Sequence, residues 1–187
     1  GVGKFLLEII AENPNKFYRF EKNKLKRKLN LVGYDKGFMD KEMKTIILAK
    51  ANMLIYLSEL VRENYKNCGE FSELFNDTFK LQTKSILGTL NTPASEEYEL
   101  ILTNPPYVVD GSKNFKEEIK NNKLLYHYTE SSLGIEGLFM QWIVKALKPD
   151  GKAFVIIPSG TLDRIPDKKL RKYIAEECFI DAIISLP

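Results

Sequence analysis

The sequence predicts an α/β fold in which helices cover both faces of a mostly parallel sheet. Short, continuous apolar segments, typical of buried parallel strands, alternate along the chain with longer segments whose apolar residues recur at helical spacing. Turn residues separate the two kinds of segment. Because 187 residues suffice for one domain with a sizeable core, we expect residues 1–187 to form a single domain.

Each predicted element follows from a local pattern. Residues 29–34 read as a buried strand ending in Asp35, and Asp40 is placed to cap a helix that continues to Val61. Residues 98–103 form the next clear strand. The remaining elements are a helix over 136–147, a turn at 148–151, a strand over 153–157, a helix over 167–175 and a last strand over 179–186.

The segment Asn104-Pro105-Pro106-Tyr107 directly follows the strand at 98–103. An exocyclic amino group on adenine is a poor nucleophile, because its lone pair is delocalised into the ring. The Asn104 side-chain oxygen and the Pro105 carbonyl can accept its two hydrogens, which localises and aims the lone pair. The prolines hold φ at about −65°. Tyr107 offers a ring on which a base can stack, worth roughly 1–3 kcal/mol.

An ordinary Asn-Pro turn closing a strand is the structural alternative for this segment. We favour the catalytic interpretation because a double proline flanked by these two residues is rare by chance. Asp35, Asp77 and Asn104 are all predicted at or just after strand ends. Since ligands bind at the carboxyl ends of parallel strands, we expect one cleft to hold all three.

Several segments resemble the N6-adenine DNA methyltransferases, most closely the modification subunits of type I restriction–modification systems and their fused type II relatives. Asn104 to Tyr107 is similar to the family's catalytic tetrapeptide, and residues 1–8 resemble the second half of its glycine-rich first motif. Pro158–Leu162 and Ile183–Pro187 are closest to the type I subunits. The resemblance implies a Rossmann-like fold and methyl transfer from S-adenosylmethionine to the N6 amino group of an adenine flipped out of double-stranded DNA.

The same resemblance implies a set of cofactor contacts. Gly1 and Gly3 match the glycine-rich turn, and Asp35 matches the acidic residue that binds the cofactor's ribose hydroxyls. Lys36 stands where the family often has a residue that packs against the cofactor's adenine; a lysine stem can do this while its ammonium stays hydrated. Asp77, followed by Thr78, matches the aspartate that accepts a hydrogen bond from the adenine amino group.

The chain begins within the first motif of this family. We therefore expect a fold truncated before its first strand and after its sixth, without the family's upstream helical domain and downstream recognition elements. Taken alone, the 187 residues are expected to bind S-adenosylmethionine weakly or not at all and to be inactive. The resemblance also implies a specificity subunit or fused recognition domain as partner, and a restriction subunit as a further one.

Two groups of lysines raise the question of DNA contact. Residues 108–133 read as a long polar loop, and we expect its lysines to touch phosphate beside the flipped base: Lys113, Lys116, Lys120 and Lys123. The basic run at 22–28 lies between the first helix and the strand ending at Asp35, at the opposite edge of the predicted sheet. For this run we favour a solvated or partner-facing surface over a substrate DNA site.

Composition sets outer limits on function. Two cysteines, with no secretion signal or long apolar segment, indicate a reducing cytoplasm and no membrane span. The only histidine, His127, lies in the predicted polar loop and is expected to be solvated, so no metal site is predicted. A net charge of +3 is below that of a dedicated DNA-binding domain.

Two other functional classes stay open from the sequence. The same Asn-Pro-Pro-Tyr tetrapeptide occurs in methyltransferases that modify protein glutamine or RNA bases. A non-catalytic scaffold that keeps the fold is the third hypothesis. The segments at 158–162 and 183–187 favour the DNA enzyme.

Overall fold

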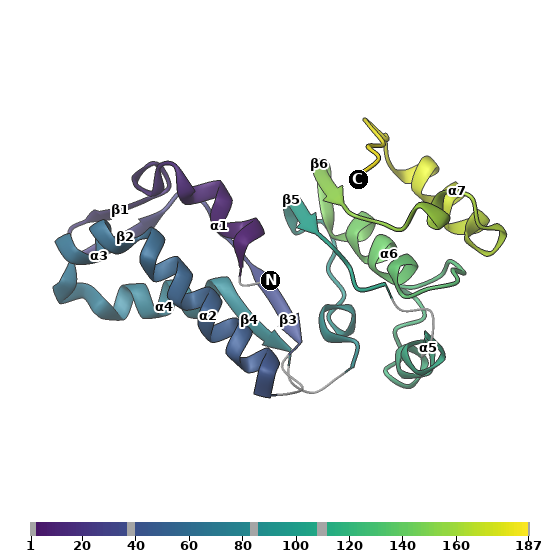
Figure 1. The fold of residues 1–187 in the computed structure, drawn as a ribbon, viewed down its shortest axis with the longest axis horizontal. Coiled ribbons are helices and arrows are strands. Elements are labelled where there is room, and N and C mark those ends of the chain that lie inside the picture. The colour runs from purple at the N-terminus through teal and green to yellow at the C-terminus, as the bar shows by residue number, and fades with distance from the viewer. Residues whose placement is uncertain (1–2, 37–39, 83–85, 108–111, 187) are drawn as a thin grey trace. The chain divides into compact units, whose positions relative to one another are not determined.

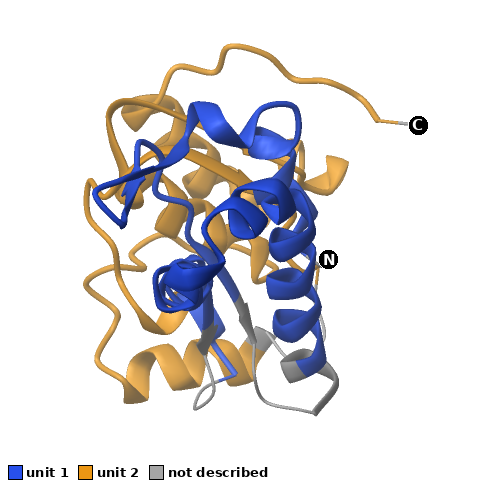
Figure 2. Ribbon diagram, turned by 90° about the vertical axis from the view of Figure 1, so that its left-hand side faces the viewer, with its two compact units in different colours: residues 1–89 blue, residues 90–187 orange. Residues whose placement is uncertain are grey.

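The computed structural model of the chain describes residues 3–36, 40–82, 86–107 and 112–186 (Figure 1). The fold is α/β, and it divides into two compact units, Gly1–Thr89 and Leu90–Pro187, coloured separately in Figure 2. The described residues form three two-stranded sheets, two of which are parallel. No helix among them is long and apolar enough to cross a membrane.

In its described residues, the first unit has four α-helices and two strand pairs. Its elements, in chain order, are α1 (Lys4–Ala11), β1 (Tyr18–Glu21), β2 (Lys24–Arg27), β3 (Gly33–Lys36), α2 (Asp40–Tyr56), α3 (Ser58–Glu63), α4 (Cys68–Thr78) and β4 (Phe79–Gln82). Strands β1 and β2 form an antiparallel hairpin, and β3 pairs with β4 in parallel. The predicted strand at 29–34 therefore begins four residues later than expected, at Gly33.

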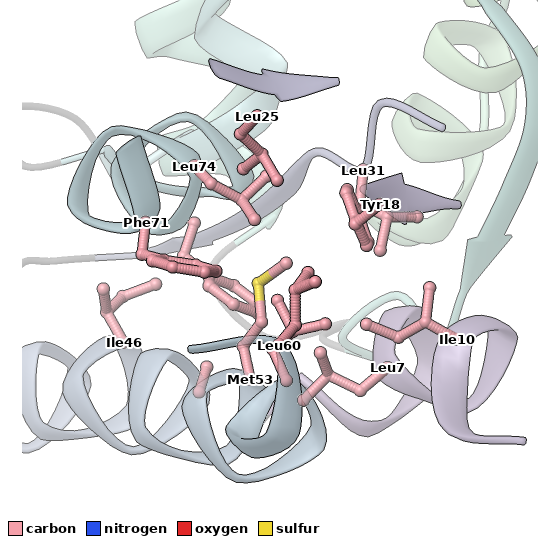
Figure 3. Close-up of a cluster of buried hydrophobic side chains, with 13 residues drawn as sticks. Leu7, Ile10, Tyr18, Leu25, Leu31, Ile46, Met53, Leu60, Phe71 and Leu74 are labelled. Carbon is pink, nitrogen blue, oxygen red and sulfur yellow. The ribbon is translucent and has the colours of Figure 1, made fainter. Parts of the chain in front are cut away.

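An apolar cluster holds the first unit together (Figure 3). Helix α2 contributes Met53, which is fully buried, and α4 contributes Phe71 and Leu74. Fully burying a side chain of this size contributes about 1.5–3 kcal/mol. The predicted helix over 40–61 is interrupted only at Leu57, whose side chain is fully buried in the same cluster. The helical pattern in the sequence thus identified the inward face only in part: Ile46, Leu57 and Leu60 are buried, whereas Ile47 and Leu54, which share the predicted spacing, are 62% and 44% exposed.

The second unit carries the Asn104–Tyr107 segment. Its main elements are β5 (Tyr98–Thr103), α5 (Ser112–Asn121), α6 (Glu136–Ala146), β6 (Leu147–Val155) and α7 (Lys168–Glu177), with short 3-10 turns at Ser159–Leu162 and Ile165–Asp167. Strands β5 and β6 pair in parallel, with Thr103 opposite Val155. The predictions for β5, α6 and α7 are confirmed within a few residues.

Strand β6 contains the turn that the sequence predicts at 148–151. Its register with β5 jumps from Tyr98 opposite Leu147 to Leu100 opposite Lys152. Asp150 has a φ of 63° there, a left-handed conformation that a bulge or turn requires. The turn is therefore a bulge near the start of β6, and the strand begins earlier than the predicted residue 153.

The predicted last strand at 179–186 is wrong for the structure described. These residues form no ladder with any described strand. Phe179 is fully exposed, and Ile184 is 77% exposed. An apolar, β-branched sequence favours an extended strand, but it becomes one only when a neighbouring strand takes up its backbone hydrogen bonds.

Candidate active site

The Asn104–Tyr107 segment leaves the carboxyl end of β5. The Ile156 amide donates to the Thr103 carbonyl over 3.1 Å, so the parallel pairing continues up to the residue before Asn104. Asn104 is exposed, Pro105 is buried, and Tyr107 is 47% exposed. The buried proline anchors the segment, while the amide and the phenol ring on either side of it are accessible.

The Tyr107 hydroxyl connects the segment after β5 to the segment after β6. It donates to the Ile156 carbonyl over 3.0 Å and also lies in hydrogen-bond contact with Asn104 Oδ1. Partial burial and the charge of Glu136 both raise the pKa of Tyr107. The phenol is therefore protonated at neutral pH and serves as a donor. Since it has one proton, its two acceptors compete for it.

A buried ionic cluster holds the segment that follows β6. Arg164 donates to Glu136 Oε1 over 2.6 Å and to Asp167 Oδ2 over 2.7 Å, and both carboxylates are almost fully buried. The hydrogen bond with Glu136 is the main cause that raises the pKa of Arg164. Arg164 also donates to the Thr161 hydroxyl over 3.2 Å. The cluster thus ties the 159–162 turn to the first residue of α6.

The same cluster reaches the segment before α6. The Leu133 amide donates to Asp167 Oδ1 over 2.8 Å, and Lys116 donates to the Ser132 carbonyl over 2.7 Å. Sequence reasoning missed Glu136, Arg164 and Asp167 because each charged residue alone reads as part of a solvated surface. The sequence signal that could have indicated the cluster is Arg164, which lies between Asp163 and Asp167 just after the 158–162 segment.

The predicted long loop at 108–133 is wrong over residues 112–121, which form helix α5. Ile119 is buried and fixes the inward face of this helix. Lys113, Lys116 and Lys120 are three and four residues apart and therefore share one face. Lys123 follows the helix and is also exposed. The four lysines are thus presented largely by a helix rather than by a loop.

The prediction that His127 is solvated is also wrong. Its ring is buried, contacts Tyr128 at a centroid distance of 4.9 Å, and has no hydrogen-bond partner for Nε2 in the described structure. Burial, followed by the positive charge of Lys145, lowers the pKa of His127 to about 4. The ring is neutral at physiological pH and packs as an apolar group.

Three of the predicted cofactor residues lie at or near the β3–β4 pair. Gly3 caps α1 with a φ of 78°, and a side chain there would come within 2.9 Å of the Phe79 ring, so only glycine fits. Asp35 and Lys36 are the last residues of β3, at its carboxyl end. Their side chains, and all of Gly1, lie outside the described structure.

The prediction that Asp77 follows a strand is wrong. Asp77 and Thr78 end helix α4, directly before β4, so they lie at the amino end of the parallel pair whose carboxyl end contains Asp35. Asp77 accepts a hydrogen bond from Arg27 over 2.7 Å, and Thr78 is buried. A cofactor contact by Asp77 and Thr78 has no support in this placement. The carboxyl end of β4 is instead occupied by Gln82, which pairs with Lys36 at the end of β3.

The described part of the chain lacks a cluster of potential metal ligands. No group of three His, Cys, Asp or Glu side chains there is arranged to hold an ion. The described site itself presents hydrogen-bond acceptors and a ring face at the end of β5. This donor and acceptor set suits a planar substrate with an amino group.

Comparison with known proteins identifies the family of the chain. Residues 12–187 match the family model of the N-6 DNA methylases. The methylase subunit of the type I restriction enzyme EcoEI from Escherichia coli is 36% identical over 107 residues, which make up 53% of this chain and 20% of that protein. The chain thus spans a small part of this relative's length. Since the family model covers nearly the whole sequence, the chain belongs to the N-6 DNA methylase family.

Proposed function

We propose that this chain forms part of a DNA methyltransferase that transfers a methyl group from S-adenosylmethionine to the N6 amino group of adenine, within a restriction–modification system. The observation that carries the proposal is the accessible Asn104–Tyr107 segment at the carboxyl end of a parallel strand, in a chain of the N-6 DNA methylase family. Family membership favours DNA over protein glutamine or RNA as substrate.

Asn104 and Pro105 would position the attacking nitrogen. Asn104 Oδ1 and the Pro105 carbonyl each accept one hydrogen of the amino group, so that its lone pair points at the methyl carbon. S-Adenosylmethionine, when bound, supplies an electrophilic methyl group. Pro106 keeps the segment rigid. The target adenine would be flipped out of the duplex and stacked on Tyr107, and the stacking offsets part of the unpairing cost.

Tyr107 would change its hydrogen bonding when the base enters. In the structure its hydroxyl contacts Asn104 Oδ1, the acceptor that the substrate needs. The Ile156 carbonyl, 3.0 Å away, can hold the hydroxyl alone. We infer that base binding directs the hydrogen bond of this hydroxyl to the Ile156 carbonyl alone, while the proton stays on the phenol, and that Asn104 Oδ1 is then free to accept from the base.

Gly3, Asp35 and Lys36 fit the cofactor best among the predicted residues. The left-handed turn at Gly3 brings a backbone without a side chain to the start of α1, as a nucleotide-binding turn requires. Asp35 lies at the carboxyl end of β3, where ligands of parallel sheets bind, and its carboxylate would accept hydrogen bonds from the ribose hydroxyls. A Rossmann-like arrangement of the parallel pairs is part of this proposal.

The lysine face of α5 would contact DNA phosphates beside the flipped base. Lys113 and Lys120 are exposed, while Lys116 is hydrogen-bonded to Ser132. The name of the E. coli relative, a methylase subunit of a type I restriction enzyme, supports assembly with a separate specificity subunit that reads the DNA sequence.

Transfer of labelled methyl groups tests the proposal. The intact protein is incubated with labelled S-adenosylmethionine and unmethylated duplex DNA, and the modified base is identified after hydrolysis of the DNA. N6-Methyladenine is expected. Label found only in the protein, or in no acceptor, would contradict the proposal.

A further inference from the structure

The β1–β2 hairpin concentrates the positive charge of the protein. Residues 18–28 contain six Lys and Arg and one Glu, whereas the whole chain has a net charge of only +3. The rest of the chain is therefore net negative. This segment precedes β3 in the first unit, whereas the Asn104–Tyr107 segment belongs to the second.

The two arginines of the hairpin are already paired with carboxylates. Arg27 contacts Asp77 and Arg19 contacts Glu21, each over 2.7 Å. The remaining cations are exposed, and none of them forms an ion pair within the described part of the chain: Lys22, Lys24, Lys26 and Lys28. The hairpin thus has four lysines available to a partner.

The outer face of the hairpin has one cross-strand pair of like charges, while its other pair, Glu21 opposite Lys24, combines unlike charges. Arg19 on β1 pairs in register with Lys26 on β2. The neighbouring pair of Phe20 and Leu25 faces inward, where Leu25 is buried. Glu21 compensates the charge of Arg19, whereas Lys26 forms no ion pair in the described part of the chain, so an anion placed on this face would neutralise an uncompensated cation.

The hairpin is anchored to helix α4 of the first unit in the absence of a partner. The Leu25 amide donates to Glu70 of α4 over 3.0 Å, and the Phe20 ring packs on Phe71 at 5.3 Å. Lys22 and Asn23 form a two-residue turn with φ values of 51° and 62°, the conformation that favours tight hairpins. A rigid surface loses little freedom on binding.

The composition of this face indicates what kind of partner it fits. Protein–protein interfaces have apolar cores and are depleted in lysine, but no residue between 18 and 28 is an exposed large hydrophobic side chain. Lysines bind phosphate as point charges without demanding a fixed geometry. Lys24, Lys26 and Lys28 follow one another at alternate positions, about 7 Å apart. Duplex DNA offers one negative charge per about 1.7 Å of its axis.

We propose that the β1–β2 hairpin binds the phosphate backbone of duplex DNA, in place of the solvated or partner-facing surface that the sequence alone favours for these residues. This inference rests on the proposed function, which supplies DNA as substrate. The contact is independent of sequence, because phosphates carry no base identity. It adds affinity and fixes orientation, while base recognition stays with other elements.

Salt dependence of DNA binding tests this inference. Three lysines are replaced together, Lys24→Gln, Lys26→Gln and Lys28→Gln, in the intact protein, and binding to a labelled duplex is followed by fluorescence anisotropy at several salt concentrations. Since each neutralised phosphate contributes about 0.9 to the slope of log K against log salt, the slope should become shallower by about 3. In the matched control, Lys168, Lys169 and Lys172 of α7, which are also exposed, are replaced by Gln instead. The slope of log K against log salt should then stay that of the wild type.

Each possible result of this experiment either supports or overturns the inference. An unchanged slope in the hairpin variant overturns it, and so does an equal change in the α7 control. Loss of association with a protein subunit at unchanged DNA affinity would also overturn it, by assigning the hairpin to an acidic protein surface. Methyl transfer by the wild-type protein is measured in parallel. Hairpin-dependent DNA binding without methyl transfer would support this inference and contradict the proposed function.

Discussion

The Tyr107 hydroxyl donates to the Ile156 carbonyl over 3.0 Å and thereby joins the segments that leave two parallel strands. The same hydroxyl contacts Asn104 Oδ1. The proposed stacking residue therefore has two separable parts, a ring for the base and a hydroxyl that braces the segment. Substitutions can test the two parts independently.

Tyr107→Ala should lower kcat/KM by roughly 5- to 150-fold, because it removes a stacking contribution of about 1–3 kcal/mol. Tyr107→Phe keeps the ring and loses only the hydroxyl, so its loss should be clearly smaller. Steady-state kinetics with duplex substrate measure both. Equal losses of kcat/KM in the two variants would show that the hydroxyl, and not the ring, contributes to catalysis.

Asp35→Ala should weaken binding of S-adenosylmethionine by roughly 1.5–3 kcal/mol, the range for hydrogen bonds to a charged group. The reason is its predicted contact with both ribose hydroxyls. Isothermal titration calorimetry on the intact protein measures the change. Asp77→Ala serves as the comparison, since Asp77 lies at the opposite end of the strand pair. An unchanged affinity in Asp35→Ala removes this residue from the site.

Arg164→Ala should lower the free energy of unfolding by about 3–5 kcal/mol, because it leaves the buried Glu136 and Asp167 carboxylates without their cation. Arg19→Ala breaks an exposed ion pair with Glu21 and should cost less than about 1 kcal/mol. Urea unfolding of the intact protein compares them. Similar small losses in both variants would mean that the Arg164 cluster is not a stabilising element.

Protonation of His127 should destabilise the fold in mild acid. The pKa of His127 is about 4 in the folded state, against about 6.5 in an unfolded chain, so the unfolded state binds more protons between these values. Stability is therefore fully present above about pH 6.5 and falls as the pH drops toward 4. The advantage of the wild type over His127→Gln should shrink by about 2–3 kcal/mol across this range. Unfolding at several pH values measures it; a constant difference would contradict the buried, neutral ring.

Elements with a complete local signal could be predicted from the sequence. Strand β5 has the predicted bounds 98–103, and α6 begins at the predicted residue 136, because a continuous apolar segment and a long amphipathic one leave little ambiguity. The placement of Asn104 after β5 follows directly. Helix α5 was not predicted because its sequence is polar and Ile119 is its main buried residue, so it has no clear apolar face at helical spacing.

Other features depend on contacts that local sequence does not encode. Asp77 ends a helix instead of following a strand, since the boundary between α4 and β4 lies one residue beyond it. The contact of Arg164 with Glu136 joins residues 28 positions apart. His127 is buried because Tyr128 and Lys145 pack around it. The prediction treated residues 108–133 as one polar loop, although two leucines and two tyrosines flank this histidine in the sequence.

Asn104→Ala in the intact protein tests the central claim most directly. Methyl transfer is measured in single turnovers with saturating S-adenosylmethionine and duplex DNA, and cofactor affinity is measured separately. Because Asn104 would contact the amino group where the geometry for attack is set, the variant should lose methyl transfer while keeping nearly the wild-type cofactor affinity. A rate within about threefold of wild type would contradict the assignment of Asn104 as the residue that orients the adenine amino group.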